Sequence, residues 1–134
     1  MNINLMKTEI EEACRTRDFN RTCQALAIAI PASKSLEGQP GYEEFQEAAM
    51  IATIWVKTIG AKVEIVGKFM TTMSKQSLEN GIFDYHVGRM FIDAVDDLKT
   101  IMKWDSIDPN FYINVDYIYS TAKPYVEAME EGEV

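Results

Sequence analysis

Two pairs of carboxylates are the residues of this chain whose spacing could do chemistry. Glu44 and Glu47 open an expected helix, and both lie near the line of its apolar face. Asp93 and Asp96 have the same separation in a later expected helix. Mg²⁺ prefers oxygen ligands and keeps water in its remaining positions, so two helices that presented these pairs toward each other could bind it.

The four carboxylates resemble a pattern of the all-helical nucleotide pyrophosphohydrolases, in which one helix carries Glu-x-x-Glu and a later helix Glu-x-x-Asp. The matching residues here are Glu44 and Glu47, then Asp93 and Asp96. The resemblance implies Mg-dependent hydrolysis of nucleoside triphosphates. This chain has Asp at position 93 where the family has Glu, and its two motifs lie further apart. The alternative is a solvated acidic edge, with Glu44 and Glu47 complementing a helix dipole.

The histidine and the two cysteines form no recognisable reactive site in the sequence. A helical metal site would place a carboxylate or a second histidine three or four residues from His86. The residues at those offsets are Ile82, Phe83, Arg89 and Met90. Cys14 and Cys23 are too few for a disulfide framework or a zinc knuckle, so we expect buried or half-buried thiols. Apart from the Mg²⁺ alternative, we expect no catalytic residue, metal or cofactor.

Aromatic residues of the last two expected helices form the other candidate site. Phe111 and Ile118 occupy the apolar stripe of the last helix, and its tyrosines cannot all share that stripe. Ile92 and Val95 are expected to flank the buried face of the preceding helix. Outer aromatic side chains are typical of protein interfaces because they bury much area at small entropic cost. The predicted interaction residues are Tyr85, Trp104, Tyr112, Tyr117 and Tyr119. The alternative is that a further helix buries these faces.

Charge limits the kind of partner. The chain has 21 Asp and Glu residues against 13 Lys and Arg residues, a net charge of −8. Such a field repels phosphate backbones, so we expect no direct nucleic-acid binding and favour a protein partner with a basic surface, or a homodimer. In size and charge the chain is similar to small acidic phage inhibitors, which implies a non-enzymatic inhibitor or regulator of a nucleic-acid-handling protein. A solubilising exterior with no specific partner is the alternative.

Length and composition predict a single helical domain over residues 1–134, in which residues 130–134 form a frayed acidic tail. The chain has 134 residues, 47% of them apolar, which suits one buried core. A bilayer crossing needs about 18 or more apolar residues, and no such stretch or secretory signal is present. We therefore expect a cytoplasmic protein that makes no membrane contact.

Apolar residues at steps of three and four predict an all-α fold, an antiparallel bundle of four to five helices. Four expected helices cover residues 4–17, 19–30, 42–76 and 82–103. A fifth runs from residue 109 into the tail. Pro31 should end the second helix, residues 33–41 form a loop, and 77–81 a turn. Asp108 and Pro109 predict a capped start for the last helix. Pro124 predicts a kink, or a break after Ala122.

The helix expected over about 42–76 is the longest and lies in the middle of the chain. Its predicted inward residues are Ile51, Trp55, Ile59, Val63, Val66, Met70 and Met73. Gly60 and Gly67 either let a neighbouring helix approach closely or mark a break near Gly60; we predict one continuous helix. For the helix over 19–30 the predicted inward residues are Phe19, Cys23, Leu26, Ala27 and Ile30.

Overall fold

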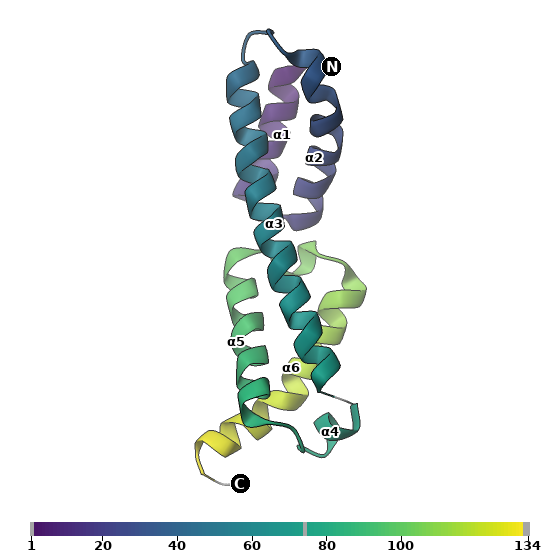
Figure 1. Ribbon diagram of the computed structural model, residues 1–134, viewed down its shortest axis with the longest axis vertical. Coiled ribbons are helices and arrows are strands. Elements are labelled where there is room, and N and C mark those ends of the chain that lie inside the picture. Colours follow the sequence, from purple (N-terminus) through teal and green to yellow (C-terminus); the bar gives the residue numbers. More distant parts are fainter. Residues whose placement is uncertain (1, 74, 133–134) are drawn as a thin grey trace. The chain divides into compact units, whose positions relative to one another are not determined.

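The computed structural model describes residues 2–73 and 75–132, with the backbone alone at Lys75 and Gln76. These residues form six α-helices and two 3-10 turns and contain no strand (Figure 1). The helices are α1 (Ile3–Arg15), α2 (Phe19–Ala32), α3 (Tyr42–Thr72), α4 (Lys75–Glu79), α5 (Tyr85–Ile101) and α6 (Pro109–Glu130); the turns are η1 (Ser33–Leu36) and η2 (Trp104–Ser106). The predicted all-α bundle with one long central helix is confirmed. Among the described helices, none combines the length and apolarity needed for a bilayer crossing.

The chain divides into two compact units, residues 1–60 and residues 61–134. The boundary falls inside α3, so each unit contains one part of that helix. Unit 1 has its own apolar core, whose buried residues come from α1, α2, η1 and α3. Unit 2 has buried residues on α3, α4, α5 and α6. The prediction of a single domain over the whole chain stays a prediction.

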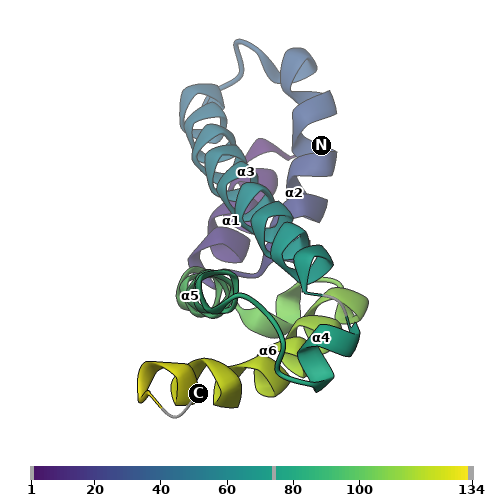
Figure 2. The same cartoon turned by 60° about the horizontal axis from the view of Figure 1, so that its bottom comes forward.

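Unit 1 is a bundle of α1, α2 and the first part of α3, which lie side by side in both views (Figure 1; Figure 2). The chain reverses between α1 and α2 at Arg17, whose φ of 58° is left-handed. The side chain of Asp18 then caps α2 by accepting from the backbone N–H of Arg21 at 3.0 Å. The buried core residues are Ile3, Ile10, Ala25, Leu26, Ala29, Leu36, Phe45 and Ala52.

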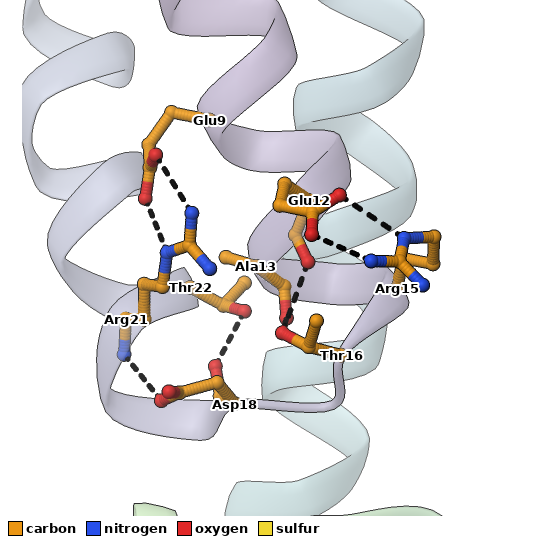
Figure 3. A network of polar contacts seen from close by, with 8 residues as sticks. All are labelled: Glu9, Glu12, Ala13, Arg15, Thr16, Asp18, Arg21 and Thr22. Atoms are coloured by element: carbon orange, nitrogen blue, oxygen red, sulfur yellow. Dashed lines mark hydrogen bonds and ion pairs between the residues drawn. The ribbon is translucent and has the colours of Figure 1, made fainter.

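Polar contacts stabilise the connection between α1 and α2 (Figure 3). The guanidinium of Arg21 donates to both carboxylate oxygens of Glu9, at 2.6 and 3.0 Å, and so joins the two helices. Thr22 is fully buried, and its hydroxyl donates to the carbonyl of Asp18 at 2.7 Å. Burial of this hydroxyl therefore leaves no donor unsatisfied.

The face that α2 turns toward this core differs from the predicted one. Its buried residues are Thr22, Ala25, Leu26 and Ala29. Ala27 is exposed and Ile30 is 57% exposed, so their predicted inward position was wrong. Alanines at 25 and 29 allow close packing against neighbouring helices, whereas the predicted face ran through Ala27 and Ile30 and left these two alanines out. The helix also continues through Pro31 to Ala32, past its predicted end.

The buried stripe along α3, and just beyond its end, repeats every seven residues. It consists of Phe45, Ala52, Ile59, Val66 and Met73, each at most 3% exposed. Ile51 was predicted to face inward and is instead 54% exposed. In this part of α3 the inward face is rotated by one residue, because the small Ala52 lies in the unit 1 core.

The two glycines of α3 neither break the helix nor admit a neighbour. The helix runs continuously through Gly60 and ends at Thr72, short of its predicted end near residue 76. An added Cβ at Gly60 or Gly67 would meet no described atom within 4 Å. The structure therefore supports a continuous helix and contradicts the interpretation of close helix approach.

In unit 2, α5 packs against α6 (Figure 1). Gly88 lies at this contact, since an added Cβ would come within 2.8 Å of Val126 and 2.6 Å of Phe83. Ile92 and Val95 were predicted to flank the buried face but are 2% and 0% exposed, because α5 is enclosed on a wider arc than one apolar stripe. The buried residues of α5 and α6 include Phe91, Ile92, Val95, Leu98, Val115, Ala122 and Val126.

Local capping decides where the helices of unit 2 begin. α5 starts at Tyr85, later than predicted, because the Asp84 side chain accepts from the backbone N–H groups of His86 and Val87. The predicted turn over 77–81 is partly the short helix α4. α6 begins as predicted, with Asp108 as cap and Pro109 in the first turn.

The last helix runs unbroken through Pro124 to Glu130, so the predicted break after Ala122 is wrong. Glu130 lies inside this helix and accepts a hydrogen bond from Arg89 at 2.9 Å. Of the predicted acidic tail, residues 133–134 lie outside the described residues.

Candidate protein-interaction site

The predicted aromatic residues differ in their exposure. Tyr117 is 53% exposed. Tyr85, Trp104, Tyr112 and Tyr119 are half-buried. Tyr85 packs edge-on against the ring of His86, with centroids 5.4 Å apart, and burial raises the pKa of its phenol. Tyr117 is therefore the predicted residue that the fold leaves most accessible.

Trp104 and Tyr119 belong to a cluster centred on Lys99. The ammonium of Lys99 lies 5.0 Å from the centroid of the Trp104 ring and 4.8 Å from that of the Tyr119 ring, within the range of cation–π attraction. The indole N–H of Trp104 donates to Asp116 at 2.9 Å, which joins η2 to α6. These contacts hold both aromatic rings inside unit 2.

Tyr119 also joins α6 to α5. Its hydroxyl donates to a carboxylate oxygen of Asp96 at 2.7 Å. Burial raises the pKa of the Tyr119 phenol above its ordinary value, and the hydrogen bond to Asp96 raises it further. The phenol therefore stays protonated and remains a donor at neutral pH.

The outer face of α6 carries no charge over three turns. From Pro109 to Ala122 the helix has one charged residue, Asp116, and that carboxylate is bound by Trp104 and Lys99. Ile113 and Tyr117 are 59% and 53% exposed and are neighbours on the helix surface. The exposed uncharged residues of this face are Asn110, Ile113, Asn114, Tyr117 and Ser120.

A pocket of about 280 Å³ opens beside Tyr117. Besides Tyr117, its lining comes from the end of α3 and the residue that follows it, from α4, and from α6. These lining residues are Met70, Met73, Leu78, Asn114 and Ile118. We call this pocket and the exposed residues of α6 the Tyr117 face. Its aromatic, methionine-containing and charge-free composition is that of the centre of a protein interface.

The four carboxylates of the Mg²⁺ alternative are divided between the two units. Glu44 and Glu47 line a pocket of about 500 Å³ in unit 1, with Lys7 and Arg15 also in its wall. In unit 2, Asp93 accepts from Arg89 at 2.8 Å. Asp96 is bound by Tyr119, as described above. Among residues 2–73 and 75–132, no group of three or more His, Cys, Asp or Glu side chains could hold a metal ion.

The remaining reactive side chains have unremarkable surroundings. His86 is exposed. Cys14 and Cys23 are free, half-buried thiols, in agreement with the prediction, and burial raises the pKa of each. At neutral pH both are therefore predominantly protonated, which makes them poor nucleophiles.

No family model, curated protein or solved structure matches this chain. The support for the candidate site therefore comes from its geometry alone. Sequence reasoning included Tyr117 but missed Ile113, Met70 and Leu78, which come from three separate helices. The low charge of residues 109–122 was the sequence signal that distinguished this part of α6 from α5, but this interval contains Tyr112 and Tyr119 as well as Tyr117.

Proposed function

We propose that this chain is a non-enzymatic interaction module that binds another protein through the Tyr117 face. The observation that supports this proposal is an exposed, charge-free surface on α6 within a strongly charged unit. Ile113 and Tyr117 project from it beside an apolar pocket. An anchoring side chain of the partner fits such a pocket, and well-packed anchors supply most of the binding energy of protein interfaces.

Charge favours a partner with a basic surface. Residues 61–134 contain thirteen Asp and Glu residues against seven Lys and Arg residues, so unit 2 carries most of the net charge. Such a field attracts a basic protein during diffusional encounter and repels an acidic one. A small regulator that occupies the basic surface of a nucleic-acid-handling protein is the concrete form of this proposal.

Site-specific photo-cross-linking tests the proposal. A photoreactive phenylalanine analogue replaces Tyr117 in one variant and Met90 in another, and each variant is expressed in the native host. Met90 is a suitable control because it is 55% exposed and lies on α5 of the same unit. We expect a covalent adduct with one predominant protein from position 117 and none from position 90. Adducts of equal yield from both positions, or none from position 117, would contradict the proposal.

A further inference from the structure

An apolar groove runs between α2 and α3 in unit 1, away from the surface of the proposed function. Its volume is about 400 Å³. The groove includes Ala27 and Ile30, the two residues of α2 that were wrongly predicted to face the core. Its main lining residues are Leu26, Ala27, Ile30, Pro31, Thr53 and Val56.

An apolar ridge on α3 borders this groove. Met50 and Ile54 are 57% and 59% exposed and lie one turn apart on the helix. Each is three residues before a groove residue, Thr53 and Lys57 respectively, so ridge and groove are adjacent on the same helix. One surface of unit 1 therefore presents both a hollow and a projection of apolar character.

This surface is almost free of charge. Residues 22–33, which cover most of α2 and the residue after it, contain no charged side chain. Residues 48–56 of α3 contain none either. Lys57 is the one charged residue in the groove lining. At the corner of α1 and α2, Glu9 is paired with Arg21 and Glu12 with Arg15 (Figure 3).

The lack of charge restricts what can cover the groove. Apart from Lys57, the lining offers a charged partner surface no ion pair to offset its loss of hydration, which is unfavourable. The occupant must therefore present an uncharged apolar ridge, and the chain itself carries one in Met50 and Ile54. In a two-fold symmetric dimer the same patch of both copies meets, so a patch with its own ridge and groove is complementary to itself.

We infer that two copies of this chain associate through unit 1, with Met50 and Ile54 of each copy lying in the α2–α3 groove of the other. The contact buries apolar side chains of both copies, and none of the ridge and groove residues is acidic. Unit 2, which carries most of the negative charge, does not contribute to it. This inference is independent of the proposed function, because it concerns different residues in a different unit.

Sedimentation equilibrium of the full chain tests the inference. The monomer mass is 15.2 kDa. With rising concentration we expect the average mass to approach twice this value. Ile30→Asp puts a charge into the groove and should weaken dimerisation at least tenfold. The matched control is Ile28→Asp, since Ile28 is 56% exposed against 57% for Ile30 but points to another side of α2, outside the groove. This control should behave as the wild type.

The two cysteines report on the location of the contact. Cys23 lines the groove, whereas Cys14 lines a different pocket between α1 and α3. Thiol labelling of Cys23 should slow as the concentration rises, while labelling of Cys14 keeps its rate. A wild type that stays at 15.2 kDa up to about 1 mM would overturn the inference. So would an Ile30→Asp variant that dimerises normally, or a dimer in which Cys23 labels as fast as in the monomer.

Discussion

At the scale of single residues, Gly88 is required by the close approach of α5 and α6. A Cβ at this position would lie 2.8 Å from Val126 and 2.6 Å from Phe83, closer than van der Waals contact allows. We expect Gly88→Ala to lower the free energy of unfolding by about 1–3 kcal/mol, the usual cost of overpacking a core. Urea denaturation followed by circular dichroism measures this change.

Gly67→Ala is the control for that substitution. Gly67 is also inside a helix, but an added Cβ there meets no described atom within 4 Å. Because alanine has the higher helix propensity, this change should raise the free energy of unfolding by up to about 1 kcal/mol. If both substitutions destabilise the protein equally, close packing at Gly88 is not the cause of the destabilisation by Gly88→Ala.

The ion pair between Glu9 and Arg21 makes unit 1 sensitive to acid. The hydrogen bond from Arg21 holds the pKa of the Glu9 carboxyl below its ordinary value of 4.5. A carboxyl whose pKa is lowered in the folded state stabilises the protein fully above its unfolded-state pKa and loses this effect as the pH falls through the lowered value. Glu9→Gln should therefore be less stable than wild type at pH 7 and approach it below pH 4.5.

Urea denaturation at a series of pH values between 7 and 3 measures that difference. Arg21→Gln should remove the same part of the acid dependence, because it removes the donor to Glu9. If wild type and Glu9→Gln lose stability in parallel throughout this range, the assignment of acid sensitivity to the Glu9–Arg21 pair is contradicted.

At the scale of secondary-structure elements, α6 contains a proline in its interior and is nevertheless continuous. Pro124 is exposed and lies inside the helix, where it cannot donate to the carbonyl one turn earlier. We expect Pro124→Ala to raise the free energy of unfolding by about 1–3 kcal/mol, since proline is the least favourable residue of a helix interior. Urea denaturation checks this value.

The neighbouring exposed residue Glu127 provides the control for α6. Glu127→Ala changes an exposed side chain of the same helix and should alter stability by no more than about 0.5 kcal/mol. If Pro124→Ala is instead destabilising, the local shape imposed by the proline is needed for the packing of Val126, which is 1% exposed.

A helix start could be predicted from the sequence where residues within one turn of it determine it. The start of α6 was predictable because Asp108 and Pro109 act within one turn. The start of α5 was not, because apolar spacing predicted a helix from residue 82, earlier than the Asp84 cap permits. The predicted inward faces of α2 and α3 left out Ala25, Ala29 and Ala52, which lie in the core.

At the scale of the whole molecule, most of the negative charge lies in unit 2, whereas both units carry exposed apolar surface. Unit 2 combines most of the negative charge with the Tyr117 face, while unit 1 carries the uncharged groove. Binding of a basic partner through unit 2 should therefore depend on salt. Raising the ionic strength from about 0.05 M to about 0.5 M should slow association markedly and change dissociation little, because screening acts on long-range attraction. Surface plasmon resonance with the cross-linked partner measures both rates.

The candidate site was predictable only in part. The sequence identifies aromatic residues in excess of one buried stripe, and Tyr117 is among them. It does not show that Trp104 and Tyr119 surround Lys99, because this cluster forms from α5, η2 and α6 together. Nor does it show that Met70 and Leu78 lie beside Tyr117, since both belong to other helices. These relations depend on tertiary packing.

Calorimetric titration of the purified partner against three forms of the chain tests the role of the Tyr117 face most directly. Tyr117→Ala removes a ring that is 53% exposed beside the pocket, and Met90→Ala removes a side chain of similar exposure on α5. We predict that Tyr117→Ala weakens binding at least tenfold, as truncation of an interface anchor does, while Met90→Ala binds as the wild type. Unchanged affinity of Tyr117→Ala would contradict the account.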